Sequence, residues 1–188
     1  TMFHAKEGYK NNMSIVIGTT GLNDDQEKEL LYLSKKIPIV YSANFSIGVT
    51  LLSSLVSKVT KTLGFDWDIE VLEMHHKQKV DSPSGTALLL GKSAADARHQ
   101  ELSNVKSISR DGLVGKRKVD EIGFAVLRGG DVVGEHSVLF CNSGERIELA
   151  HKATDRSIFA SGALRASYWA ARAEPGLYSL ADVLENGG

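Results

Sequence analysis

Short apolar runs on either side of a helical pattern open the chain. Residues 13–17 and 37–41 are apolar, and the first is rich in β-branched side chains, as strands buried on both faces are. Between them, Asn23 with Gln26 three residues later forms a capping-box signature, and the helix that it starts must end before Pro38. A strand, a helix and a strand within about thirty residues predict a βαβ unit, and hence a parallel sheet.

Each of these two strands runs into a polar loop, at 18–21 and at 42–45. The carboxyl ends of neighbouring parallel strands share one edge of a sheet, where open α/β sheets bind ligands. The first loop, Gly-Thr-Thr-Gly, also fits an ordinary turn between a strand and a helix, so the loops are candidate binding segments only.

The pattern changes in the middle of the chain. Residues 47–63 place leucine and valine on one face and are followed by Gly64, which predicts a helix. Residues 67–74 predict a strand, and 87–99 the helix that follows it. Residues 100–118 are polar and contain glycine, so we expect a loop there.

Three more strand patterns follow, at 122–127, 132–140 and 146–151. The connections at 128–131 and 142–145 are turn sequences short enough for hairpins. We therefore predict an antiparallel sheet, which makes the middle of the chain a separate α+β domain.

The end of the chain predicts a helix at 157–173 and a short one at 179–184. The predicted fold class is therefore α/β plus α+β, with a parallel sheet in one domain and an antiparallel sheet in the other.

Composition limits the classes of function. The chain has 188 residues and 20.4 kDa, with 42% hydrophobic and 24% charged residues, as in an ordinary globular protein. A net charge of -1 gives no reason to expect nucleic acid, and no apolar run approaches the length of a membrane span. Cys141 is the single cysteine and cannot form an internal disulfide, which fits a reducing compartment. Residues 1–10 do not form a signal peptide, and we expect them to be the tail of a helix in a fragment.

The densest chemistry lies at 73–86, Glu-Met-His-His-Lys-Gln-Lys-Val-Asp-Ser-Pro-Ser-Gly-Thr. Two imidazoles and two ammonium groups fall within five residues, and imidazole is an acid that titrates near neutral pH. Residues 84–86 then open a helix, whose N-terminus favours a carboxylate or phosphate. Together they predict a pocket for a small anion that must also be protonated. The alternative is a solvated basic turn followed by an ordinary helix cap.

A metal site is not expected. His75 and His76 are adjacent, so on a strand their side chains face opposite sides. No ligand spacing such as His-Glu-x-x-His is present. The remaining potential ligands are Glu73, Asp81 and two histidines that we interpret as ordinary sheet residues, His136 and His151.

Nucleophilic hydrolysis is the rival class of chemistry. Ser84 lacks the Gly-x-Ser-x-Gly elbow, and Cys141 lies in a predicted strand without an activating partner. Lys152 and Arg156 are cations that could meet an anion, or simply be solvated.

Several long motifs give the chain a family resemblance. The segment His-His-Lys-Gln-Lys-Val-Asp-Ser-Pro-Ser-Gly-Thr-Ala closely resembles the signature of the dihydrodipicolinate reductases of bacterial lysine biosynthesis. The resemblance extends over nearly the whole chain, through motifs at 16–21, 43–46, 121–125, 130–136 and 144–153.

The resemblance implies site residues. His75 would be the proton donor, assisted by Lys79. The groups that would hold the substrate's carboxylates are His76, Ser84, Gly85 and Thr86. The residues that would line the nicotinamide end of the cofactor site are Gly18, Thr19, Thr20, Ser42, Ala43, Asn44 and Phe45, with Arg156 near the domain junction.

It also implies a reaction and an assembly. Members reduce 4-hydroxy-tetrahydrodipicolinate, a cyclic dicarboxylate, to tetrahydrodipicolinate with NADH or NADPH and without a metal. They are cytoplasmic homotetramers built by the sheets of the substrate domain. By this resemblance, 1–46 is a remnant of a Rossmann-like dinucleotide-binding domain, 47–155 is the substrate and tetramerisation domain, and 156–188 is a helical return.

One departure is large. Family members begin with a Gly-x-Gly-x-x-Gly phosphate loop, and this chain has no such motif after a strand. We expect an N-terminally truncated reductase whose 188 residues lack most of the cofactor affinity. The alternative is a non-catalytic fragment that binds dicarboxylate and oligomerises.

Overall fold

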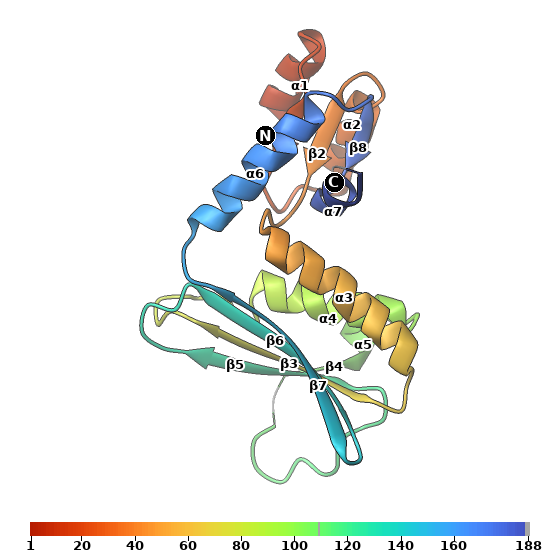
Figure 1. Ribbon diagram of the computed structural model, residues 1–188, viewed down its shortest axis with the longest axis vertical. Helices are drawn as coiled ribbons and strands as arrows, with labels where there is room; N and C mark the ends of the chain where they lie inside the picture. Colours follow the sequence, from red (N-terminus) through yellow and green to blue (C-terminus); the bar gives the residue numbers. More distant parts are fainter. Residues whose placement is uncertain (109, 187–188) are drawn as a thin grey trace. The chain divides into compact units, whose positions relative to one another are not determined.

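The computed structural model describes residues 1–108 and 110–186 (Figure 1). The chain divides into two compact units, Thr1–Thr50 with Arg156–Gly188, and Leu51–Asp155. The first division falls inside helix α3 (Ile47–Leu63), whose bounds are those predicted from its apolar face and from Gly64.

The first unit contains a three-stranded parallel sheet in the order β1-β2-β8. Its strands are β1 (Ile15–Ile17), β2 (Pro38–Tyr41) and β8 (Gly176–Tyr178). Its helices are α1 (Met2–Lys10), α2 (Asp24–Leu33), α6 (Ser157–Ala170) and α7 (Leu180–Asn186). The predicted βαβ unit is confirmed by the parallel pairing of β1 with β2.

Local interactions explain helix α2 and strand β2 of this unit. The Asn23 side chain accepts the Gln26 amide at 2.9 Å, and the Gln26 side chain accepts the Asn23 amide at 3.0 Å, so the predicted capping box is present. Ile39 packs in a core with α1 and α2, whereas Val40 packs in a core with α6 and α7. The strand is therefore buried on both faces, as its apolar run predicted.

The C-terminal helix is shorter than predicted, and β8 was not predicted. α6 ends at Ala170, and after residues 171–175 the segment Gly176–Tyr178 pairs with β2. A strand of three residues is too short to produce an alternating pattern. Contacts with neighbouring elements hold it in place: the ring centroids of Tyr178 and Trp169 lie 4.7 Å apart, edge to face.

The second unit is a five-stranded sheet in the order β4-β5-β3-β6-β7. Its strands are β3 (Asp68–His75), β4 (Lys106–Ser107), β5 (Ile122–Arg128), β6 (Gly134–Asn142) and β7 (Glu145–Ala153). α3, α4 (Gly85–Ala97) and α5 (Leu102–Val105) lie along one face of this sheet (Figure 1). The core between them contains the side chains of Ile69, Val71, Leu90, Phe124, Val138 and Phe140.

The sheet is mixed, so the prediction of a fully antiparallel sheet is wrong for one strand. β5 does not form a hairpin with β6; it pairs in parallel with β3, which separates the two. The connection between them crosses the end of β3, where Gly129 donates its amide to the His75 carbonyl. A turn sequence predicts the local backbone conformation, but it does not predict whether another strand lies between the two strands that the turn connects. The hairpin of β6 and β7 is confirmed, with Gly144 at a φ of +83° in its turn.

Two further boundaries differ from prediction. The expected loop at 100–118 contains α5 and β4, which are too short to produce a periodic pattern. β3 extends to His75, one residue beyond the predicted strand, and this places Glu73 and His75 on the same face of the sheet. None of the helices in the part of the chain that the structure describes has the length and apolar character to span a membrane.

Candidate functional site

The candidate site lies at the carboxyl end of β3. Side chains alternate along this strand, and Ile69, Val71, Glu73 and His75 all belong to its buried face. Glu73 is 1% exposed and His75 is 8% exposed. A carboxylate in a row of buried aliphatic side chains is costly unless donors surround it, so its partners are the first thing to establish.

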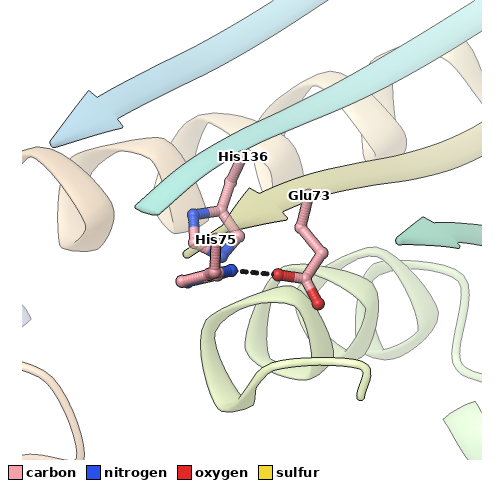
Figure 2. A group of neighbouring side chains, drawn as sticks. All are labelled: Glu73, His75 and His136. Carbon is pink, nitrogen blue, oxygen red and sulfur yellow. Dashed lines mark ion pairs between the residues drawn. The ribbon is translucent and has the colours of Figure 1, made fainter. Parts of the chain in front are cut away.

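Three donors surround the Glu73 carboxylate. Its Oε1 accepts the backbone amide of Ser84 at 2.9 Å and Nη2 of Arg128 at 3.1 Å. Its Oε2 lies against Nδ1 of His75, and the two form an ion pair when the imidazole is protonated (Figure 2). Burial by itself raises the pKa of Glu73, but the hydrogen bonds from Arg128 and Ser84 and the charges of His75 and Arg128 outweigh it and lower that pKa. The carboxylate is therefore ionised at neutral pH.

His75 is held in a neutral state by its surroundings. Burial lowers the pKa of the imidazole; the Glu73 carboxylate opposes this shift, and the charge of Lys79 adds to it. A Cβ placed on Gly134 would lie 3.0 Å from Nε2 of His75, so the glycine lets β6 pass close to the ring, and a larger residue would require the imidazole to shift. An anion bound nearby would raise the pKa again and favour the protonated acid.

A second imidazole, His136, lies against the first. β6 places His136 directly opposite Glu73, and the rings of His136 and His75 meet edge to face at 5.0 Å (Figure 2). His136 Nε2 lies 3.0 Å from the Ser84 hydroxyl, and Nδ1 is buried without a hydrogen-bond partner among the residues that the structure describes. Burial, and then the charge of His75, lower the pKa of His136 to about 4.

Ser84 joins the strand to the helix. Its hydroxyl caps α4 by accepting the Ala87 amide at 3.2 Å, while its own amide donates to Glu73. The side chain that we expected to hold a substrate carboxylate is thus buried between His136 and the first turn of α4. Gly85 and Thr86 are the first two residues of this helix, so its positive end lies beside the Glu73–His75 pair.

Lys79 and His76 lie at the edge of the site. Lys79 Nζ contacts Asp81 Oδ1 at 2.8 Å, and this hydrogen bond lowers the pKa of Asp81. Lys79 also donates its amide to the His76 carbonyl at 3.1 Å, which closes the turn after β3. His76 is half-buried where His75 is buried, so the two adjacent histidines are in different environments.

The predicted cofactor loops meet at one edge of the parallel sheet in the first unit. The Ser42 amide donates to the Ile17 carbonyl at 3.1 Å, and a Cβ on Gly18 would lie 3.4 Å from the Phe45 ring. The predicted residues of the two loops that lie at this edge are Gly18, Thr19, Thr20, Ser42, Ala43, Asn44 and Phe45. Arg156 is the N-cap residue of α6, in the same unit.

Three residues contribute to the site beyond those predicted. The sequence pattern offers Glu73 only as a potential metal ligand, His136 as an ordinary sheet residue and Arg128 as part of a turn. The signal for Glu73 was available, because it stands two residues before His75 on a strand whose same face is aliphatic. Arg128 and His136 could be placed in the site only by knowing that β3 pairs with β5 and β6, and the sequence does not predict these pairings.

Donor atoms of Glu73, His75 and His136 lie within 4.8 Å of one another, close enough to share a metal ion. The charges around them favour a different use. Arg128 already binds the carboxylate, and the charge of Lys79 acts on both imidazoles. A divalent ion would add positive charge among these cations and separate Glu73 from His75. The donor set fits a hydrogen-bonded carboxylate–imidazole pair better than a metal centre.

Known proteins resemble this chain over most of its length. The family model described as dihydrodipicolinate reductase, C-terminus, matches residues 48–184, and the model described as dihydrodipicolinate reductase, N-terminus, matches residues 1–45. The 4-hydroxy-tetrahydrodipicolinate reductase of Rhodopseudomonas palustris (strain HaA2) is 53% identical over 169 residues, which are 90% of this chain and 62% of that protein. The enzyme of the same name from Bartonella bacilliformis is 48% identical over 186 residues, which are 98% of this chain and 69% of that protein.

A solved structure agrees with these matches. The dipicolinate-bound dihydrodipicolinate reductase of Paenisporosarcina sp. TG-14 superposes with a TM-score of 0.77 at 26% identity, over 95% of this chain and 67% of that one. The chain therefore spans between 62% and 69% of the length of these relatives.

Proposed function

We propose, because this chain belongs to the dihydrodipicolinate reductase family, that it serves the NADH- or NADPH-dependent reduction of 4-hydroxy-tetrahydrodipicolinate to tetrahydrodipicolinate in lysine biosynthesis. The observation that carries the proposal is the buried Glu73–His75 pair beside the N-terminus of α4. An acid next to a site for carboxylates is what the reduction of a dicarboxylate requires.

In the proposed reaction His75 is the proton donor. The nicotinamide, when bound, supplies a hydride to one end of a conjugated imine. His75 gives its Nε2 proton to the carbon left electron-rich and takes a proton back from solvent. Overall, the substrate gains one hydride and one proton and loses its hydroxyl group as one water, and the cofactor is oxidised. Lys79 supplies positive charge that favours the dianionic substrate.

The carboxylates of the substrate would be held at the start of α4. Gly85 and Thr86 begin the helix there, and His76 and Lys79 lie at the turn after β3. The Paenisporosarcina enzyme holds dipicolinate, a planar dicarboxylate of similar outline, and we extend that ligand to this chain. Ser84 would act through its cap on α4, because its hydroxyl is already shared with Ala87 and His136.

The residues of the first unit fit the nicotinamide end of the cofactor. Gly18 leaves its backbone groups unshielded by a side chain, and the Phe45 ring of the second loop lies within van der Waals reach of the position of its absent Cβ. Thr19, Thr20, Ser42, Ala43 and Asn44 would complete this lining, with Arg156 at the start of α6.

We also propose a cytoplasmic homotetramer assembled through the five-stranded sheet. The face of this sheet opposite to α3, α4 and α5 carries half-buried or exposed apolar side chains. They are Leu72, Met74, Ala125, Leu127 and Leu139. Residues 47–155 would then be the substrate and assembly domain, and 1–46 with 156–188 the cofactor side.

A second candidate function is a fragment that binds dicarboxylate and assembles without turning over. The 188 residues contain no Gly-x-Gly-x-x-Gly motif after a strand, and that motif is what holds a dinucleotide pyrophosphate.

One set of measurements separates the two candidates. Consumption of NADH and NADPH would be followed with 4-hydroxy-tetrahydrodipicolinate, and binding of dipicolinate and of each cofactor by calorimetry. Turnover with either cofactor supports the reductase. Dipicolinate binding without turnover or cofactor binding supports the second candidate, and no dipicolinate binding contradicts both.

A further inference from the structure

We infer that Glu73 is the positioning residue of this site: its carboxylate sets the hydrogen on His75 and, through the Ser84 amide, the place where α4 begins. The inference rests on the proposed function, in which His75 is the proton donor. It concerns a residue that contacts the acid and the backbone of the anion-binding helix, and not the substrate itself.

The protonation of His75 follows from the chemistry of its partner. An ionised carboxylate can only accept hydrogen bonds, so the Nδ1 that contacts Glu73 Oε2 must carry a hydrogen. Neutral His75 is then the Nδ1–H tautomer, with its lone pair on Nε2. When His75 is protonated, the added proton is on Nε2, and giving it up restores the tautomer that Glu73 already favours. Glu73 therefore directs the transferable proton to one defined nitrogen.

The second oxygen of the same carboxylate ties the helix to the strand. Ser84 is the N-cap residue of α4, and its amide donates to Glu73 Oε1 at 2.9 Å. The first turn of α4 is thus fixed relative to His75 by a single side chain of β3. Arg128 donates to the same oxygen at 3.1 Å and balances the buried negative charge.

Both oxygens are needed for this arrangement. If Glu73 served only to anchor α4 and pair with Arg128, one oxygen would suffice and the other would have no reason to face an imidazole. A carboxylate that is 1% exposed is costly; here Oε1 accepts hydrogen bonds from Ser84 and Arg128, and Oε2 is in direct contact with Nδ1 of His75.

The test is Glu73→Gln, which keeps the size of the side chain and inverts one hydrogen bond. The position of Oε1 faces two donors, Ser84 N and Arg128, so the amide oxygen must take it. The amide NH₂ then faces Nδ1 of His75 as a donor, and Nδ1 must accept. E73Q should therefore convert neutral His75 to the Nε2–H tautomer and disfavour its protonated form, with the fold retained.

The first readout is nitrogen NMR of the histidine rings in this chain. We expect the Nδ1–H tautomer for His75 in the wild type, the Nε2–H tautomer in E73Q, and a lower acid midpoint for His75 in E73Q. The wild-type measurement stands without any variant: an Nε2–H tautomer in the wild type would overturn the inference even if E73Q failed to fold.

Glu70→Gln is the matched control. Glu70 lies on the same strand, three residues earlier and on the opposite face, and it too is bound by an arginine, Arg110, at 2.7 and 2.8 Å. E70Q should leave the His75 tautomer and titration unchanged. An equal effect of E70Q and E73Q would mean that a general loosening of β3, and not the carboxylate at 73, sets the imidazole.

Kinetics in a form that turns over separates this inference from the proposed function. We expect E73Q to lower kcat roughly 100-fold and the dipicolinate Kd to change by less than about 3-fold, since general acid catalysis contributes ~10²–10⁴-fold. If His75→Gln lowers turnover and E73Q does not, the positioning role fails alone. If neither variant lowers turnover, the proton-donor role in the proposed function fails first.

Discussion

At the scale of single residues, three ionisable side chains share a small space and differ in charge. Donor atoms of Glu73, His75 and His136 lie within 4.8 Å of one another, and all three residues are buried. Glu73 stays ionised because its donors outweigh its burial, whereas burial keeps both imidazoles neutral. Side chains with pKa values moved from their ordinary range by burial and charge are a common mark of functional sites.

His75→Gln tests the acid directly. Glutamine keeps a polar side chain of similar length but cannot supply a proton near neutral pH, so we expect turnover to fall by ~10²–10⁴-fold. The Kd of dipicolinate and of the cofactor should change far less, because neither is expected to depend on that proton. Steady-state kinetics with calorimetry measures both, and unchanged turnover would remove the acid role from His75.

The buried His136 predicts a loss of stability in weak acid. Its pKa is about 4 in the folded chain against 6.5 as the ordinary value, so below pH 6.5 the unfolded chain binds a proton that the folded chain does not. This contribution to stability is fully present above pH 6.5 and is lost as the pH falls toward 4. Between pH 7 and pH 5 we expect it to cost roughly 2 kcal/mol.

Urea unfolding at the two pH values measures this loss, with His136→Gln as the comparison. H136Q should lose roughly 2 kcal/mol less than the wild type between pH 7 and pH 5. A residual loss is expected in both proteins, because burial also lowers the pKa of His75 and His151. Equal losses in the two proteins would show that His136 titrates normally when folded.

At the scale of elements, the site depends on where β3 ends and α4 begins. α3 and α4 follow from amphipathic patterns, and the capping box of α2 follows from Asn23 and Gln26, so these elements were predictable from sequence. The position of β5 was not predictable, because its parallel pairing with β3 joins segments far apart in the sequence, such as Ile69 and Ile122. The same pairing brings Arg128 to Glu73, which is why the arginine was missed.

Ser84→Ala should destabilise the chain more than the loss of an ordinary helix cap. It removes the cap of α4, worth ~1 kcal/mol, and leaves Nε2 of His136 buried without its partner, worth a further ~1–3 kcal/mol. Asn23→Ala, which removes the exposed cap of α2, is the comparison and should cost only ~1 kcal/mol. Urea unfolding measures both; equal costs would mean that the Ser84–His136 hydrogen bond contributes nothing.

Gly162→Ala should disturb the second cofactor loop. A Cβ at Gly162 of α6 would lie 1.8 Å from the Phe45 carbonyl oxygen, so helix or loop must shift. We expect a loss of ~1–3 kcal/mol in unfolding free energy and displaced amide signals at 42–45. Ser161→Ala, at the neighbouring exposed position of α6, is the control and should leave the loop signals in place. Unchanged signals in G162A would contradict the close approach of α6 to Phe45.

At the scale of the whole molecule, the proposed assembly and the proposed chemistry use opposite faces of one sheet. The buried face of the five-stranded sheet carries Glu73, His75 and His136, and the other carries the apolar side chains of the proposed tetramer contact. The alternation of side chains along each strand makes the assignment of residues to the two faces predictable. No local sequence pattern predicts which surface packs against the face opposite to α3, α4 and α5.

Leu139→Lys tests the proposed assembly. Leu139 lies on the open face between Glu70 and Glu148 in the neighbouring strands, so a lysine there is tolerated in a single chain. It would place a charge in the proposed apolar contact between copies, so light scattering should show a smaller species for L139K than for the wild type. Val119→Lys, at an 85% exposed loop position, should leave the mass unchanged. An unchanged mass for L139K would show that assembly does not use this face.

The division of the chain into two units also divides the reaction by what is transferred. Glu73, His75, Ser84, Arg128 and His136 all fall in Leu51–Asp155, and the loops assigned to the nicotinamide fall in the other unit. In the proposed reaction, the residues that supply the proton and the loops that meet the hydride donor are thus encoded in different stretches of polypeptide. Substitutions in the loops proposed to line the nicotinamide can then accumulate in one stretch while the residues that set the acidity of His75 are inherited unchanged.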